Sequence, residues 1–114
     1  MTTKRLERTQ WKSYFNDTAK SLESMQVEIE ISGPHIGDQI EAEWVSLNGL
    51  SYDDRTNTFD VATNQLNHRI AGVEAINVEQ DFTGLKSMEL VDGNGNHQIL
   101  RFKPPLALPE LATS

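Results

Sequence analysis

The feature that most constrains this chain is a change of hydrophobic period near Met25. Before it, apolar and aromatic residues recur at helical spacing, which places them on one stripe of a helix. After it, Val27, Ile29 and Ile31 alternate with glutamates, which is typical of a strand with one buried face. The residues of the helical stripe are Trp11, Tyr14, Phe15, Thr18 and Leu22. The sequence therefore predicts a helix over about 9–24, capped by Thr9, followed by strands.

Turn signals divide the remaining chain into short strands. A strand over 38–47 should end at Asn48-Gly49, and the polar residues 53–57 should form a hairpin loop. The clearest hairpin surrounds 92–96, whose glycines and asparagines accept the positive φ of a tight turn. Pro104-Pro105 should stop the last strand, because proline donates no ladder hydrogen bond. The prediction is an α+β fold: an N-terminal amphipathic helix and about six short antiparallel strands in a strongly bent sheet or small open barrel.

The length predicts a single domain. With 114 residues, 37% of them hydrophobic, the chain suffices for one modest core. No linker or repeat divides it, so we assign 1–114 to one domain, with a strand region over about 26–103 and an extended proline-rich tail over 104–114.

Charge limits the partners. The net charge is -7, which opposes binding to nucleic acid or an anionic membrane and favours a basic partner. The first twenty residues carry five basic and two acidic side chains, a balance of +3, so the remainder carries -10. There is no cysteine, no apolar leader in the first eight residues and no apolar run of about 20 residues, so we expect a cytoplasmic protein.

The motifs that carry common chemistries are missing. Residues 92–96 begin like a calcium loop, but His97 and Lys103 stand where such a loop needs glycine and glutamate. The chain has no phosphate-binding glycine loop and no nucleophile elbow, and its three histidines lack helical zinc spacing. We therefore predict no catalytic residue, no cofactor and no metal, and we expect a binding protein rather than an enzyme.

The leading hypothesis is a protein-interaction module, with Glu41, Glu43 and Trp44 as candidate interaction residues. Acidic strand faces would meet a basic protein partner, and self-association as a homodimer through an edge strand or the helix is an alternative. Trp44 has two interpretations. It packs in the core if it shares a face with Ile40 and Ala42, and it is a surface anchor if the register slips after Glu43.

Two other functions remain open. His35, Asp38 and His68 would form the pocket of a small-molecule-binding protein or minor enzyme if the fold brings them together. Carboxylates spaced like phosphates along one face would instead make the chain an acidic mimic of nucleic acid that inhibits a basic protein.

Several segments together resemble a small bacterial family of unknown function. The segments that carry the likeness, between Leu6 and Pro109, are GDQIEAEW at 37–44, LSYD at 50–53, LNHRI at 66–70, INV at 76–78 and the VDG…QILRF hairpin at 91–102. The resemblance implies a bacterial single-domain protein inside the cell and supplies no activity, cofactor or partner.

Overall fold

The computed structural model describes residues 2–18, 25–81 and 84–106 of the chain. In chain order, its elements are β1 (Thr2–Arg5), the 3-10 turn η1 (Arg8–Gln10), α1 (Trp11–Thr18), β2 (Gln26–Gly33), β3 (Gly37–Asp53), β4 (Thr58–Thr63), β5 (Asn67–Ala71), β6 (Val73–Asp81), β7 (Gly84–Asp92) and β8 (His97–Leu106). The predicted α+β class is confirmed. The predicted number of about six strands is wrong, because eight strands lie in the described part of the chain.

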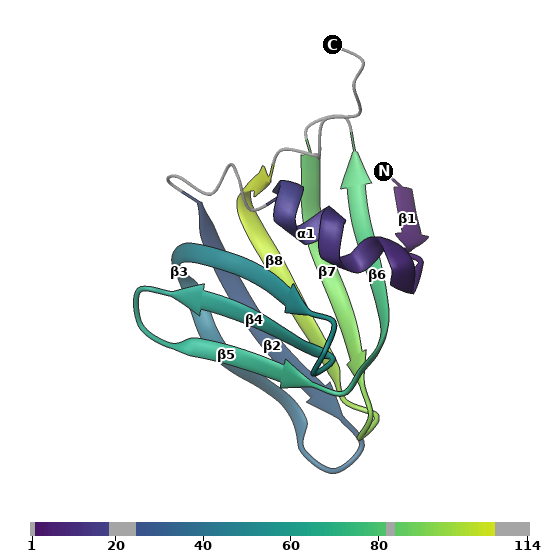
Figure 1. The fold of residues 1–114 in the computed structure, drawn as a ribbon. Helices are drawn as coiled ribbons and strands as arrows, with labels where there is room; N and C mark the ends of the chain where they lie inside the picture. Colours follow the sequence, from purple (N-terminus) through teal and green to yellow (C-terminus); the bar gives the residue numbers. More distant parts are fainter. Residues whose placement is uncertain (1, 19–24, 82–83, 107–114) are drawn as a thin grey trace.

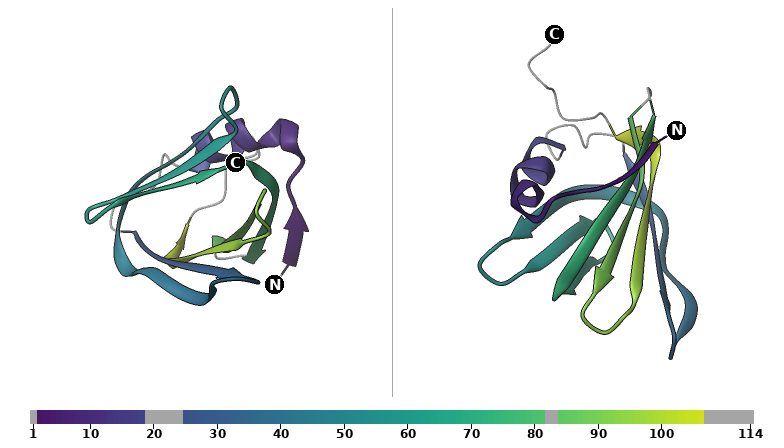
Figure 2. Two further views of the ribbon diagram at one scale, coloured as in Figure 1. Left: turned by 90° about the horizontal axis from the view of Figure 1, so that it is seen from below. Right: turned by 90° about the vertical axis from the view of Figure 1, so that its right-hand side faces the viewer.

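All eight strands join one antiparallel sheet in the order β1-β6-β7-β8-β2-β3-β4-β5 (Figure 1). The sheet is strongly bent and stays open, as the view along it shows (Figure 2). Its β4–β5 end curls toward the same side of β6, β7 and β8 on which α1 lies. The core therefore fills the hollow side of the sheet, and the opposite side faces outward.

Aromatic residues close that core. Phe15 from α1 and Phe59 from β4 are fully buried, with ring centroids 4.6 Å apart. Trp11 is also buried, meets the ring of Tyr52 edge-on at 5.3 Å and donates its indole N–H to the Leu6 carbonyl. Edge-to-face pairs of this kind stabilise beyond the area they bury. The helical stripe thus acts as a lid over the sheet.

The helix differs from its prediction at its start. Thr9 does not cap it, because Thr9 lies inside η1 and the first cap is Glu7, whose backbone N–H donates to the Gln10 side chain. The described α1 begins at Trp11 and ends at Thr18; the predicted residues 19–24, Leu22 among them, lie outside the described residues. Tyr14 is half-buried on the stripe, and burial raises its pKa to about 12.

The longest strand, β3, was predicted as two. It continues through Asn48-Gly49, where a register shift between Leu47 and Gly49 marks a bulge rather than a turn. A bulge bends its strand and increases the local twist. Because of this bend, the first half of β3 pairs with β2 and the second half with β4, which carries β4 and β5 over the core.

The C-terminal hairpin is confirmed, with one correction. Asp92 Oδ1 accepts the backbone N–H groups of Asn94 and Asn96, so the loop is held as a turn. The prolines do not stop β8, which reaches Leu106. They lie where the pairing of β7 with β8 is irregular, and a ladder already broken there needs no proline N–H.

Asn57 joins three parts of the fold. Its side chain donates to the Val73 carbonyl at 3.0 Å and accepts the Tyr52 hydroxyl at 2.7 Å, while Arg8 approaches it at 3.5 Å. Its backbone has φ 52°, a left-handed conformation that asparagine tolerates better than most residues. The β3–β4 turn is therefore tied to the start of β6 and to η1 by one residue.

Replacing Asn57 separates these two contributions. Asn57→Gly keeps the positive φ and loses the hydrogen bonds, which should cost about 1–3 kcal/mol of unfolding free energy. Asn57→Ala also strains the backbone and should cost about 1 kcal/mol more. Urea unfolding measures both. Equal stability of both variants and the unmodified protein would contradict this assignment, and Asn67→Ala on the exposed edge strand is the matched control.

Candidate interaction surface

The first half of β3 is a free edge of the sheet within the described chain. β2 pairs with Gly37–Ser46 on one side, whereas β4 pairs only with Leu47–Asp53 on the other. Most residues of this half are exposed, including Asp38, Glu41 and Glu43, whereas Ala42 and Val45 are buried. An uncovered edge presents unpaired backbone groups to other chains, and charged residues and bulges are the usual means of controlling it.

Two bulges interrupt this edge. Ile29 of β2 pairs with Ala42 and Glu30 pairs with Ile40, so Glu41 is an extra residue. Val27 pairs with Val45, so Glu43 and Trp44 together oppose Glu28. Each extra residue moves the following side chains to the other face of the sheet.

The bulges decide between the two interpretations of Trp44. Ala42 and Val45 are buried, but Ile40 turns to the outer face and is 51% exposed. Trp44 is half-buried, and the register slips at Glu43-Trp44. The prediction that Ile40, Ala42 and Trp44 share a core face is therefore wrong. The register slips at Glu43-Trp44, which is the condition that the surface interpretation of Trp44 set.

Trp44 has an unusual backbone. Its φ is 50°, a left-handed value that costs a bulky residue roughly 1–3 kcal/mol. On its outer side the Lys103 ammonium lies 5.1 Å from the centre of the indole ring, within the range of a cation–π contact. Strain of this kind persists only where the surrounding structure holds it, and it is found preferentially at functional sites.

Beside Trp44, the acids of β2 are already paired. One guanidinium nitrogen of Arg101 lies 2.8 Å from Glu30 and 2.9 Å from Glu28. These contacts raise the pKa of Arg101, the hydrogen bond to Glu30 more than that to Glu28. The carboxylates of Glu28 and Glu30 are therefore neutralised by Arg101 within the sheet.

The acids in the first half of β3 differ from those of β2. Within the described residues, Asp38, Glu41 and Glu43 form no ion pair with a cation of the chain, and all three are exposed. They stand beside the exposed Ile40 and the half-buried Trp44. The edge thus combines unneutralised negative charge with apolar surface, which suits a ligand that carries both positive charge and apolar groups.

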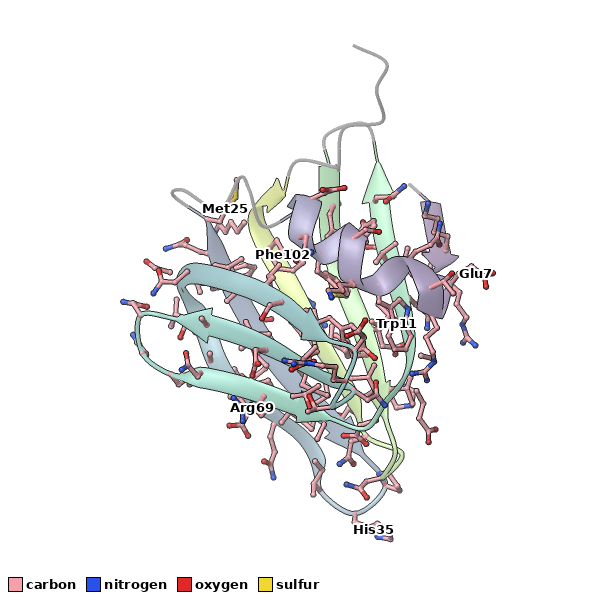
Figure 3. The ribbon with its side chains drawn as sticks, in the orientation of Figure 1. Glu7, Trp11, Met25, His35, Arg69 and Phe102 are labelled. Atoms are coloured by element: carbon pink, nitrogen blue, oxygen red, sulfur yellow. The ribbon has the colours of Figure 1, made fainter. Side chains whose placement is uncertain are left out.

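The three residues of the predicted pocket come from separate places. His35 lies at the exposed tip between β2 and β3 (Figure 3), and Asp38 follows at the start of β3. His68 comes from β5 and its Nε2 lies 2.7 Å from the side-chain oxygen of Gln98. The contact of His68 is thus made to a buried amide of β8, and neither His35 nor Asp38 takes part in it.

Sequence reasoning missed the group that His68 joins. Gln98 is buried on the hollow side, and its amide N–H donates to Asp92 Oδ2 at 3.1 Å, so three side chains from β5, β8 and β7 form a continuous hydrogen-bonded chain. The alternation along β8 places Gln98 on the same face as Leu100 and Phe102, which is the signal that predicts its burial. A buried amide needs such partners to offset its desolvation.

A shallow groove of about 470 Å³ lies between α1 and the β3–β4 turn. Lys12 lies 3.8 Å from Asp54 across it, with both side chains more than half exposed. The backbone N–H of Arg55 donates to Asp53 and lowers the pKa of that carboxyl. The groove is lined by Lys12, Ser51, Tyr52, Asp53, Asp54, Arg55 and Asp60.

Within the described ranges, no three histidine or acidic side chains come together in a way that could hold a metal ion. None of the helices in that part of the chain has the length and apolar character that crossing a membrane requires.

Arg101→Met tests whether Arg101 neutralises Glu28 and Glu30. The variant leaves two largely covered carboxylates side by side, so unfolding free energy should fall by about 1–2 kcal/mol at pH 7. The raised pKa of Arg101 keeps its guanidinium charged, so the unmodified protein has both contacts at pH 7. Urea unfolding at pH 7 measures the loss.

Arg69→Met is the control for this measurement. Arg69 pairs with Asp60 at 2.9 Å, but its side chain is 73% exposed, so we expect a loss under about 0.5 kcal/mol. Equal losses of unfolding free energy in both variants would refute the assignment.

Comparisons with known proteins give the chain a family and no activity. Residues 2–111 match the model of a family of unknown function, DUF5335. An uncharacterized protein of Aquifex aeolicus (strain VF5) is 37% identical over 111 residues, which cover 96% of this chain and all of that protein. No solved structure matches. The match over nearly the whole chain, with the bulged strand and C-terminal hairpin inside it, shows that this protein belongs to the DUF5335 family.

Proposed function

We infer that the protein is a non-enzymatic interaction module that binds a basic segment of a protein partner along the bulged edge of β3. The observation that carries this proposal is the strained backbone of Trp44, at φ 50° on an edge that no strand of the described chain covers. A strained bulky residue at an uncovered edge costs stability, and a contact made by its side chain would explain the cost.

The edge has the parts that a weak interface needs. Trp44 and Ile40 offer apolar anchors, and tryptophan is among the residues that most often dominate binding energy. Glu41 and Glu43 add negative charge next to the anchors, which steers a basic segment and suppresses acidic ones. The net charge of -7 adds a long-range attraction for basic partners.

Catalysis has less support from the geometry. His68 is engaged with Gln98, and His97 lies 2.9 Å from Glu89 on the outer face. Burial is the largest single effect on the pKa of Glu89 and acts to raise it. The hydrogen bonds from His97 and Asn77 and the charge of Arg5 outweigh burial, so the pKa of Glu89 is lowered. Both imidazoles thus contact side chains within the sheet. The pocket of His35, Asp38 and His68 stays a prediction. Mimicry of nucleic acid also stays a prediction.

A peptide in which lysine alternates with valine tests the proposal. It should raise or shift the fluorescence of Trp44, while the buried Trp11 contributes a constant background. Glu41→Lys/Glu43→Lys should weaken binding at least about tenfold, since each reversal replaces an attraction of up to ~1 kcal/mol with a repulsion. The protein concentration is kept low, so that contacts between copies do not compete.

Two controls define the outcome. Asp54→Lys/Glu74→Lys changes the net charge equally at other exposed positions and should leave most of the affinity. A peptide with glutamate in place of lysine should not bind. Equal weakening by both double variants would show attraction by net charge alone and would overturn the proposed site.

Trp44→Gly separates binding from stability. Glycine adopts positive φ without strain, so the gain in backbone energy should offset much of the lost packing. We expect unfolding free energy within about 1 kcal/mol of the unmodified protein and loss of peptide binding, measured by urea unfolding and isothermal titration calorimetry. A loss of about 3 kcal/mol or more, as expected for a core aromatic, or unchanged binding would contradict the role given to Trp44.

A further inference from the structure

The sheet has a second bare edge with the opposite charge. β1 ends the sheet beyond β6, and no strand of the described chain pairs with its other side. Its exposed residues include Lys4 and Arg5. The bare half of β3 carries Asp38, Glu41 and Glu43 instead, so one free edge is basic and another is acidic.

The basic side chains of β1 form no ion pair with a carboxylate within the described part of the chain, whereas several arginines elsewhere do. Arg55, Arg69 and Arg101 each lie within 4 Å of a carboxylate of their own chain. Lys4 has no such partner in the described part of the chain, and the side chain of Arg5 donates to the neutral amide of Asn77. The third edge, β5, carries Arg69, which Asp60 already pairs, so β1 is the edge best suited to an acidic strand.

We propose that the basic edge of β1 in one copy binds the acidic edge of β3 in a second copy and continues the sheet between the two molecules. This rests on the proposed function and names the partner as another copy of this chain. Pairing of like edges would bring the acids of two β3 edges, or Lys4 and Arg5 of two β1 edges, close to one another. Only the mixed pairing joins opposite charges.

The lengths of the two edges also correspond. β1 has four residues, and Gly37–Ile40 is a four-residue stretch that pairs residue for residue with β2 before the bulge at Glu41. The bulges confine backbone pairing to that stretch, which contains Asp38, and Glu41 and Glu43 follow directly after it. The contact is short and depends on charge. The association is therefore weak and sensitive to salt. Because the two surfaces differ, each bound copy leaves one edge of each kind free, so the contact leads to a ring or an open chain.

Sedimentation velocity with charge-reversed variants tests the proposal. The unmodified protein should exceed its 12.8 kDa monomer mass increasingly with concentration, and should return to it in about 1 M NaCl, where the Debye length is ~3 Å. Lys4→Glu/Arg5→Glu has two acidic edges and Glu41→Lys/Glu43→Lys has two basic edges. Each should be monomeric alone, and an equimolar mixture should associate again.

The same four reversals in one chain should also restore association, because the edges are then complementary with their signs exchanged. Circular dichroism verifies that each variant is folded. If Arg5→Glu disturbs the sheet beside Glu89, Lys4→Glu alone replaces the double variant. Association of either acidic or basic variant alone, or failure of the mixture and of the four-fold variant to associate, would overturn the mixed pairing.

Failure of this inference is distinguishable from failure of the proposed function. An unmodified protein that stays monomeric at every concentration and still binds the lysine–valine peptide through Glu41 and Glu43 overturns self-pairing alone. An edge that binds neither the peptide nor a second copy overturns both. Association restored by the mixture supports both, because the basic segment bound at β3 is then β1.

Discussion

β3 pairs with β2 through its first half and with β4 through its second, and the rest of the structure depends on this change of partner. The bulge at Leu47–Gly49 bends the strand, so that β4 and β5 turn over the hollow side of the sheet. Phe59 then reaches Phe15, and Asn57 reaches Val73 and Tyr52. A straight β3 would leave both aromatic clusters and the hydrogen bonds of Asn57 without partners.

The same change of partner creates the candidate surface. Because β4 leaves β3 after Leu47, the strand before that point keeps one side uncovered. Bulges at Glu41 and at Glu43-Trp44 then turn Ile40 outward and hold Trp44 at positive φ. The fold and the surface are therefore not independent: the bend that completes the core is also what leaves an edge bare.

The sequence predicted those parts of the fold whose pattern is local. The alternation of Val27, Ile29 and Ile31 and the Gly-Asn turn at 92–96 predicted β2 and the last hairpin. β1 was missed because Thr2–Arg5 contains no apolar residue to alternate. Asn48-Gly49 signals a turn in isolation, and only the pairing with β4 makes it a bulge. At the candidate surface, exposure of Glu41 and Glu43 follows from local pattern, whereas the face of Trp44 depends on a register that one sequence does not specify.

A bare edge carries a risk of uncontrolled strand pairing, and bulges, short length and charge all reduce that risk. The edge of β3 has each of these, which by itself would suit a surface that avoids partners. Trp44 and Ile40 argue otherwise, because protection is achieved more simply with polar residues at both positions. Under the proposed function, charge decides which chains bind, because the acids repel an identical edge and attract a basic one. An edge that repels its own kind while exposing apolar anchors is what the proposed selective binding requires.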